Sequence, residues 1–363
     1  MVKILGLFPL TGNGGIASWT KKFLATFPDE NYHITAINVS PETRKTGRRN
    51  GLFERFISGL KAKNRVIKEL RMLLTKNHYD ILHTTTSGNL GSYRDIAVSK
   101  LCKKHGVKTI MHCRYGCITE DIQARNLVGY LLRKSMSLFD QIWVLDTRSF
   151  NTLKNIPSLA HKVYLTPNSI EVKEVIDVNS KDYKRVAFVG NLIPTKGLFE
   201  LVEASTKCDI RLDIIGPGTD EVVLKIRQVA GDKLDKSIFI HGRLPNQDAV
   251  KFMKEVDIIA LPTYYPSEAF PISIIEAMSL TKMVISCPRA AVKDMLTDLD
   301  GNLCGMLVEP RSVDAIVDAI NWIQCHKEEA DKMCKKAYEK VYTSYRTDVV
   351  YELYRKNYNE LFR

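Results

Sequence analysis

The sequence lacks any run of about 18 apolar residues, the length that a helix needs to cross a bilayer. It also lacks low-complexity tracts, and its opening MVKILGLFPL is too short for the apolar core of a signal peptide and has no small-residue cleavage site. The composition, with 45% hydrophobic and 26% charged residues, is that of a soluble globular protein. We therefore expect a cytoplasmic protein without a membrane-spanning helix.

Cysteine is present, but its spacing shows no metal-binding pattern. None of the eight cysteines belongs to a CxxC pair. His112, Cys113 and Cys117 lie close together, yet no fourth ligand follows at a spacing typical of zinc sites. We expect reduced, mostly buried cysteines and no metal site.

Acidic residues are scarce in the first half of the chain. Residues 1–170 contain 26 Lys and Arg against 11 Asp and Glu, a net charge of +15, whereas the remaining residues contain 27 against 30, a net charge of −3. The formal charge of +12 of the 363-residue chain therefore belongs to its N-terminal half.

Eleven of these cations lie within residues 41–76, which contain only three acids. Such a concentration attracts an anionic partner, which can be a phospholipid surface, a phosphorylated acceptor or nucleic acid. Because no recognised nucleic-acid-binding module accompanies the charge, we do not expect nucleic acid as the partner. The cations are Arg44, Lys45, Arg48, Arg49, Arg55, Lys61, Lys63, Arg65, Lys68, Arg71 and Lys76.

Short aliphatic runs alternate with amphipathic stretches along the whole chain, a pattern that predicts parallel α/β architecture. In the first half we expect strands at 2–8, 33–39, 79–85, 107–112, 141–146 and 162–168, and helices at 16–27, 52–76, 92–105 and 126–139. In the second half we expect strands at 185–191, 211–216, 237–242, 257–262 and 283–286, and helices at 196–205, 221–230, 246–256, 271–280, 313–326 and 349–362.

The alternation starts afresh at residue 185, which predicts two Rossmann-like domains over 1–170 and 171–345. Pro167 and the polar stretch 178–184 mark the boundary. A last helix within 346–363 has no strand after it and is free to pack back across a domain face. Ligands of such sheets bind outside the carboxyl ends of the strands, so we expect a site in a cleft that both domains face.

A glycine cluster, TGNGGIAS at residues 11–18, stands at the first strand-to-helix turn. Gly14 and Gly15 would let backbone amides at a helix start approach an anion. A plain tight turn explains the cluster equally well, because the dinucleotide pattern GxGxxG is not met. Both interpretations stay open.

VGNLIPTKG, residues 189–197, carries Lys196 from the end of a strand into a helix start. A surface lysine is the plain interpretation, but an ammonium beside helix-end amides would also bind a diphosphate. FIHGRL, residues 239–244, is a further strand end that turns at a glycine, where a nucleobase could approach the backbone.

SEAFPISIIEAM, residues 267–278, places Glu268 in a loop before a helix and Glu276 inside it. Pro271 suits the first helical turn, and Ile272, Ile275 and Ser279 are predicted to share one face that Glu276 avoids. A carboxylate can accept hydrogen bonds from a sugar diol, so Glu276 could hold a ribose and Glu268 a hexose. The alternative is that Glu268 is only a negative charge that favours the helix start, and that Glu276 is a solvated helix residue.

These stretches together are similar to a known family. FVGNLIPTKG, LDIIGPG, FIHG, VDIIALPTYY, SEAFPISIIEAM and MVIS occur in an order and spacing that resembles the retaining nucleotide-sugar glycosyltransferases of family four, over most of residues 185–320. The N-terminal half resembles them more weakly. The resemblance implies a GT-B fold, with an acceptor-binding domain over 1–170, a donor-binding domain over 171–345 and a crossover helix over 346–363.

The resemblance also implies roles for individual residues. Lys196 would hold the donor diphosphate, Glu268 the transferred sugar and Glu276 the ribose, while His112 would lie near the reacting centre or be a buried structural histidine. It implies catalysis by Glu268, Lys196 and His112, without metal or cofactor. The implied donor-binding residues are Gly14, Gly15, Gly190, Asn191, Lys196, Gly242, Arg243, Glu268, Phe270, Pro271, Ile272 and Glu276.

The sequence departs from the family pattern at the diphosphate. Asn191 stands where the family usually has arginine, which leaves Arg114, Arg243 and Arg289 as candidates for the second cation. Ser169 replaces a glycine, and CPRAAVKD at residues 287–294 replaces a glycine-glycine loop. These changes leave the donor sugar open.

The resemblance implies transfer of a hexose-type sugar from a UDP-sugar, or alternatively a GDP-sugar, to a glycan or polyprenyl-linked acceptor in cell-surface polysaccharide or lipopolysaccharide synthesis. It implies retention by front-face attack. A non-catalytic GT-B subunit that binds a glycan or a partner is the alternative.

The basic stretch 52–76 would dock the N-terminal domain peripherally on the inner face of an anionic membrane. Its apolar stripe could serve the membrane or the domain core, and both remain open. The stripe consists of Phe53, Phe56, Ile57, Leu60, Ile67, Leu70, Leu73 and Leu74.

Overall fold

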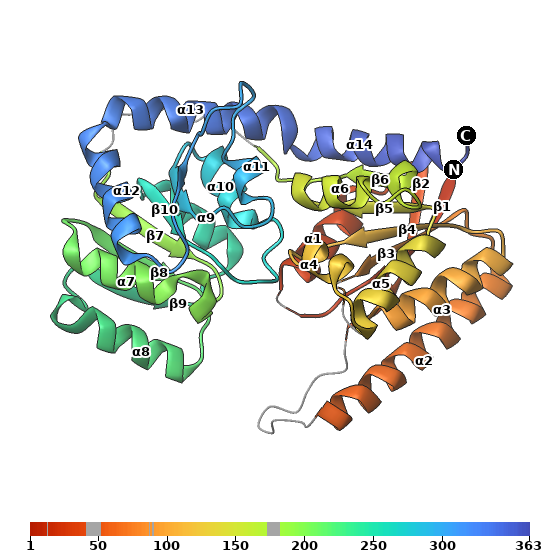
Figure 1. The fold of residues 1–363 in the computed structure, drawn as a ribbon. Helices are drawn as coiled ribbons and strands as arrows, with labels where there is room; N and C mark the ends of the chain where they lie inside the picture. The colour runs from red at the N-terminus through yellow and green to blue at the C-terminus, as the bar shows by residue number, and fades with distance from the viewer. Residues whose placement is uncertain (13, 41–51, 87, 89–90, 173–181) are drawn as a thin grey trace. The chain divides into compact units, whose positions relative to one another are not determined.

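The computed structural model describes residues 1–12, 14–40, 52–86, 88, 91–172 and 182–363, with the backbone alone at 52–60. The chain divides into two compact units (Figure 1). Unit 1 consists of Met1–Pro167 together with Tyr351–Arg363, and unit 2 of Asn168–Val350. The predicted divisions, after residues 170 and 345, lie a few residues from these. Most of the predicted boundary stretch 178–184 falls outside the described residues.

Unit 1 is built on a six-stranded parallel sheet in the order β2-β1-β3-β4-β5-β6. The strands are β1 (Val2–Phe8), β2 (Tyr32–Asn38), β3 (Ile81–Thr86), β4 (Lys108–Cys113), β5 (Gln141–Val144) and β6 (Val163–Leu165). The helices are α1 (Gly15–Thr26), α2 (Leu52–Lys76), α3 (Gly91–Lys104), α4 (Ile118–Gln123), α5 (Leu127–Leu138), α6 (Thr147–Lys154) and the last helix, α14 (Thr347–Glu360). The predicted α/β architecture of this half is confirmed; the short α4 and α6 were not predicted.

One face of this sheet is covered by α2, α3 and α5, which lie side by side (Figure 1). Leu70 and Leu74 of α2 are buried in the unit 1 core, and Ile67 and Leu73 pack against it. This part of the apolar stripe therefore serves the core and not a membrane. The side chains of the earlier part, at residues 53–60, lie outside the described residues, as do the cations at 44–49 and Arg55.

The opposite face of the sheet carries aromatic side chains and is covered by α1 and α14. Phe23 of α1 and Phe27, the residue that follows this helix, contact Tyr351 and Tyr354 of α14 edge-on or tilted. Tyr358, fully buried, places its hydroxyl 2.7 Å from His83 Nδ1 on β3. The three tyrosines are spaced at i, i+3 and i+7, so they lie on one face of α14. This face packs against the rest of unit 1.

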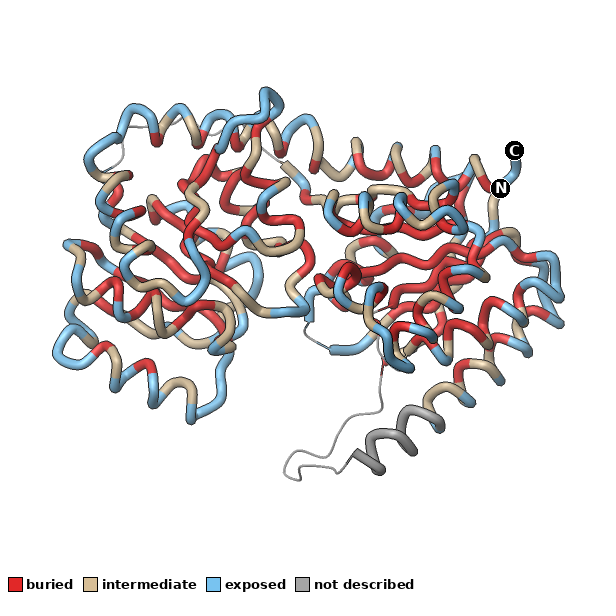
Figure 2. Tube along the Cα trace, viewed as in Figure 1, coloured by how far each residue is buried: buried red, intermediate tan, exposed pale blue. Residues whose placement is uncertain are grey.

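Unit 2 contains a second six-stranded parallel sheet, in the order β12-β11-β10-β7-β8-β9. The strands are β7 (Arg185–Val189), β8 (Arg211–Ile215), β9 (Ile238–Gly242), β10 (Ile258–Leu261), β11 (Met283–Ser286) and β12 (Met306–Leu307). The helices are α7 (Leu198–Lys207), α8 (Asp220–Ala230), α9 (Asn246–Lys254), α10 (Ile272–Ser279), α11 (Val292–Met295), α12 (Val313–Cys325) and α13 (Lys327–Ser344). Figure 2 shows both sheets buried and the outer helix faces exposed.

The 18-residue helix α13 was not predicted. Its buried face consists of Ala330, Cys334, Ala337 and Val341, small residues at helical spacing that give a weak apolar signal among many charges. The remaining unpredicted elements, α11 and β12, are four and two residues long. In the described parts of the chain, no helix combines the length and the apolar character needed to cross a membrane.

We expect the packing of α14 to be a major contribution to the stability of unit 1. Tyr358→Ala should lower the free energy of unfolding by about 3–5 kcal/mol, because it removes a fully buried ring. Tyr358→Phe should cost about 1–3 kcal/mol, since His83 Nδ1 then loses its hydroxyl partner. Urea unfolding followed by tryptophan fluorescence measures both. Lys356→Ala, at an exposed position of the same helix, is the matched control, and equal losses in all three variants would contradict the expectation.

Candidate functional site

The end of β7 forms a compact turn that carries Lys196. Gly190, at a φ of +156°, directs the chain out of the strand, and a Cβ at this position would lie 3.7 Å from Lys196 Nζ. Lys196 ends a short 3-10 turn, Pro194–Lys196, and Gly197 follows at a φ of +72° before α7 begins at Leu198. The prediction that the helix begins at Lys196 was therefore wrong, because the left-handed Gly197 separates the turn from the helix.

The next two strand ends lie beside this turn. Gly190 N donates to Ile215 O at 3.0 Å, and Leu192 N donates to Pro217 O at 2.8 Å. Gly216 N in turn donates to Gly242 O at 2.8 Å, so the carboxyl ends of β7, β8 and β9 form one continuous edge. Asn191 and Arg243 are exposed on it.

Lys196 and Glu268 form an ion pair at this edge. Lys196 Nζ lies 2.9 Å from Glu268 Oε2, and the two side chains are only 14% and 13% exposed. The Oε2 atom is buried and makes no aligned hydrogen bond with any described residue, so the contact is one of charge rather than of directed hydrogen bonding. A buried carboxylate oxygen with unused acceptor capacity is typical of a ligand-binding position.

The loop that carries Glu268 follows β10 and is held at several points. Tyr264 N donates to Thr195 O at 2.9 Å, which ties the loop to the Lys196 turn. Beyond Glu268, Ala291 N donates to Ala269 O at 3.0 Å, and the buried Asn168 Nδ2 donates to Phe270 O at 2.9 Å. Phe270 itself is buried against Tyr345, with ring centroids 5.2 Å apart. The position of Glu268 is therefore set by the fold before any ligand arrives.

α10 begins directly after this loop and carries Glu276. Pro271 is its N-cap residue and makes no side-chain cap, so the first amides of the helix face the Glu268 loop end without a capping side chain. The buried face consists of Ile274, Ile275, Ala277 and Met278. Ile272 and Ser279 are half-buried, as is Glu276, so the prediction that they share a face apart from Glu276 was wrong. Their spacing from Glu276, at i−4 and i+3, places all three together.

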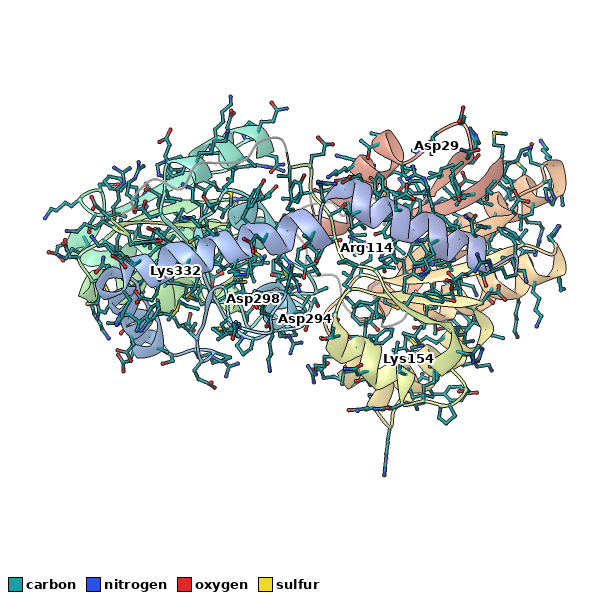
Figure 3. The ribbon with its side chains drawn as sticks, turned by 90° about the horizontal axis from the view of Figure 1, so that it is seen from above. Asp29, Arg114, Lys154, Asp294, Asp298 and Lys332 are labelled. Carbon is teal, nitrogen blue, oxygen red and sulfur yellow. The ribbon has the colours of Figure 1, made fainter. Side chains whose placement is uncertain are left out.

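The three arginines considered for the second cation lie in different places. Arg289 follows β11, and its Nη2 donates to Pro266 O at 2.6 Å, two residues before Glu268. Arg243 follows β9 and is exposed. Arg114 belongs to unit 1, where its guanidinium stacks 4.0 Å over the ring of Trp19; Figure 3 labels it. Asn168 and Thr195, which hold the site, were not predicted, because their contacts run through single backbone groups that leave no residue pattern.

In unit 1, the glycine cluster opens α1. Gly14 is the N-cap of this helix, without a side-chain cap, and has an ordinary φ of −86°. A Cβ added at Gly14 or at Gly15 would meet no atom within 4 Å among the described residues. Neither conformation nor packing in unit 1 therefore requires glycine here, whereas close approach by a ligand would. Asn13 lies outside the described residues.

His112, at the end of β4, is fully buried within the aromatic face of unit 1. Its Nδ1 lies 3.2 Å from His83 Nε2, and its Nε2 lies 3.1 Å from Arg114 Nη1. Burial, together with the charge of Arg114, holds the pKa of His112 well below its ordinary value and lowers the pKa of His83 to about 3. Both rings are therefore neutral at pH 7, and His112 Nε2 can accept a hydrogen bond from the Arg114 guanidinium.

The cysteines are all free, and five of the eight are buried. Within the described ranges, no group of three or more His, Cys, Asp and Glu side chains is arranged to hold a metal ion. The neighbouring Cys113 has a raised pKa because of burial, so its thiol is protonated at neutral pH.

Comparison with known proteins finds a similar family over the part of the chain that carries the Lys196–Glu268 pair. Residues 170–340, most of unit 2, match the family described as Glycosyl transferases group 1. The chain is 28% identical to the "Putative teichuronic acid biosynthesis glycosyltransferase TuaC" of Bacillus subtilis over 141 residues, which are 38% of this chain and 32% of that protein. It is 28% identical to the "D-rhamnosyltransferase WbpZ" of Pseudomonas aeruginosa over 160 residues, 43% and 41% of the two chains. These matches span less than half of the relatives' own lengths.

Solved structures resemble the whole chain. The sucrose-phosphate synthase of Thermosynechococcus elongatus has a TM-score of 0.77 at 15% identity and covers 100% of this chain and 99% of its own. Anabaena Alr3699/HepE, solved in complex with UDP, has a TM-score of 0.71 at 13% identity, with coverage of 99% and 100%. At these identities the likeness shows the fold, and it confirms the predicted GT-B class with two Rossmann-like units.

The buried histidine pair makes the stability of unit 1 depend on pH. An unfolded histidine titrates near pH 6.5, whereas His83 in the folded unit titrates near 3. Between these values the unfolded chain binds a proton that the folded chain does not, so stability falls as the pH is lowered through about 6.5. The loss should be about 1 kcal/mol per pH unit for each histidine.

His83→Gln should therefore weaken the dependence of unfolding on pH between 7 and 5. The measurement is urea unfolding followed through Trp19 and Trp143, both of which belong to unit 1. His33→Gln, at an exposed position of β2, is the control and should leave the dependence unchanged. Identical pH profiles for His83→Gln and the unsubstituted protein would contradict the expectation.

Proposed function

We propose that this protein is a retaining glycosyltransferase, and the match of residues 170–340 to Glycosyl transferases group 1 supports this proposal. It moves a hexose-type sugar from a nucleoside-diphosphate sugar, with UDP favoured over GDP, to a glycan or lipid-linked saccharide in cell-surface polysaccharide synthesis. The observation that carries this proposal is the Lys196–Glu268 pair, an ammonium and a carboxylate held together at the carboxyl edge of the sheet. One group suits a diphosphate and the other a sugar hydroxyl.

In this proposal the donor lies along the carboxyl edge of unit 2. Lys196 and the uncapped first amides of α10 bind the diphosphate. Glu268 accepts hydrogen bonds from hydroxyls of the transferred sugar, and Glu276, one to two turns into α10, accepts them from the ribose. Gly190 leaves room above the strand end, since a side chain there would approach the Lys196 ammonium.

The transfer itself needs stabilisation of the leaving group more than it needs a protein base. A bond forms between the acceptor oxygen and the anomeric carbon while the bond from that carbon to the diphosphate breaks. The acceptor proton passes to an oxygen of the departing diphosphate, and the new bond forms on the face that the diphosphate leaves, which retains the configuration. Lys196 and the helix amides stabilise the negative charge that develops on the diphosphate. Glu268 orients the sugar.

Unit 1 contributes the acceptor side of the proposal. A Cβ at Gly14 or Gly15 would meet no described atom within 4 Å, so the backbone amides there are open to an anionic group of a ligand. His112 enters as a positioning residue, because its fully buried ring contacts Arg114 and His83. The relative named for teichuronic acid biosynthesis supports a polysaccharide as the acceptor, and the relative named as a rhamnosyltransferase supports transfer of a hexose-type sugar.

Lys196→Ala should weaken donor binding and lower transfer by at least about a hundredfold, because the charge that stabilises the leaving diphosphate is lost. A screen of UDP-, GDP- and ADP-sugars measures thermal stabilisation and slow hydrolysis of the donor. Lys207→Ala, in a surface ion pair of α7, is the matched control and should behave like the unsubstituted protein.

Binding of no nucleotide-sugar, together with unchanged behaviour of Glu268→Ala in every assay, would defeat the assignment. Donor binding without any hydrolysis or transfer would instead favour a non-catalytic glycan-binding subunit.

We also propose that unit 1 docks peripherally on an anionic membrane, where a lipid-linked acceptor would be found. Lys61, Lys68, Arg71 and Lys76 of α2 are exposed, as are Lys100, Lys103 and Lys104 of α3. α2 and α3 are neighbours on the same face of the sheet (Figure 1). Because Ile67, Leu70, Leu73 and Leu74 of α2 serve the core, this attraction is electrostatic and sensitive to salt.

Neutralising Lys61, Lys68, Arg71 and Lys76 to Gln should weaken binding to anionic vesicles by at least about tenfold at low salt. Co-sedimentation with vesicles of neutral or mixed anionic lipid measures the effect. Four exposed lysines of unit 2, Lys225, Lys233, Lys236 and Lys251, changed in the same way form the control. Equal binding of the unsubstituted protein to neutral and anionic vesicles would contradict the proposed membrane docking.

A further inference from the structure

The Lys196–Glu268 pair is electrically neutral as a unit, although each member is placed to bind a different part of a ligand. The two groups are 2.9 Å apart and mostly buried, where the attraction between opposite charges is stronger than in water. A diphosphate that takes up Lys196 must therefore replace the carboxylate as the partner of the ammonium. It must also approach a carboxylate of its own sign.

The backbone that carries Glu268 is fixed at several points, so the carboxylate stays within reach of Lys196. Its loop is tied at Pro266 by Arg289 Nη2, at Ala269 by Ala291 N and at Phe270 by Asn168 Nδ2. On the other side, Tyr264 N holds the loop to Thr195, the residue before Lys196. The competition between carboxylate and diphosphate is therefore built into the fold.

The donor and the product differ at this carboxylate. A sugar still attached to the diphosphate can donate hydroxyl hydrogen bonds to Glu268, whose Oε2 contacts Lys196 but makes no aligned hydrogen bond with any described residue. The nucleoside diphosphate that remains after transfer has no such hydroxyl at this place. The product is therefore repelled by the Glu268 carboxylate and gains no hydroxyl hydrogen bonds in return.

We propose that Glu268 discriminates between the donor and the nucleoside diphosphate product by competing with the diphosphate for Lys196. This inference rests on the proposed function. After transfer, Glu268 loses its hydroxyl donors, recovers the ammonium and promotes release of the product. Glu268 thus weakens binding of the product while it strengthens binding of the intact donor.

The test measures dissociation constants by calorimetry for UDP, GDP and ADP alone and for their hexose conjugates. Glu268→Gln keeps the shape but removes the charge, so it should bind the preferred nucleoside diphosphate about fivefold tighter than the unsubstituted protein. The same variant should bind the matching nucleotide-sugar no tighter, so the preference for donor over product falls. Glu268→Ala should change the affinity for the diphosphate in the same direction.

A double-mutant cycle with Lys196→Gln shows whether Glu268 changes diphosphate affinity through Lys196. In the Lys196→Gln background, Glu268→Gln should change diphosphate affinity by less than about twofold, because the group competed for is gone. Glu221→Gln, exposed on α8, is the matched control for removing one negative charge from unit 2. Raised salt should reduce the difference between Glu268→Gln and the unsubstituted protein.

The outcomes separate this inference from the proposed function. If the unsubstituted protein binds none of the nucleotides, the proposed function itself is contradicted. If it binds one of them and Glu268→Gln binds that nucleoside diphosphate equally or more weakly, the inference is overturned and the function stands. Tighter binding of both diphosphate and donor by the same factor also overturns it, since the carboxylate then does not discriminate.

Discussion

The contact between the Lys196 ammonium and the Glu268 carboxylate is the interaction on which the carboxyl edge of unit 2 depends. The two residues come from distant parts of the sequence and meet because β7 and β10 are neighbours in a parallel sheet. The surrounding backbone sets the distance between the two groups. Gly197 is left-handed and lies so close to the loop after β10 that a Cβ on Gly197 would be 2.2 Å from Pro262 O. A site of opposite charges is thereby prepared without a ligand.

Much of the fold could be predicted from the sequence, for a physical reason. Strands of a parallel sheet are covered on both faces, so they appear as continuous apolar runs such as 257–262 and 283–286 that are easily recognised. α13 was not recognised because three of the four residues of its buried face are alanine or cysteine, whose apolar signal is small. The face of α10 was assigned wrongly because the apolar Ile272 lies on the half-exposed side with Glu276, so apolar residues alone do not mark the core side.

The charged residues of the candidate site could be predicted from the sequence, but the residues that hold them in position could not. Lys196 and Glu268 stand at strand ends, where the architecture of parallel sheets directs attention. Thr195 and Asn168 act through one carbonyl oxygen and one side-chain amide, and such contacts depend on tertiary structure alone. The environment of His112 was equally out of reach, since nothing in the residues near it indicates that His83 and Arg114 occupy its two ring nitrogens.

Unit 1 is discontinuous in sequence, and this has a consequence for its folding during synthesis. Unit 2 is one uninterrupted segment, Asn168–Val350, whereas unit 1 needs Tyr351, Tyr354 and Tyr358 to cover the aromatic face of its sheet. On the ribosome, domains generally fold in the order in which they are made. Here the unit that begins first is completed last: its sheet can form early, but Phe23, Phe27 and Trp143 await their cover until α14 has emerged. In that interval this aromatic surface is the part of the nascent chain most in need of protection from aggregation.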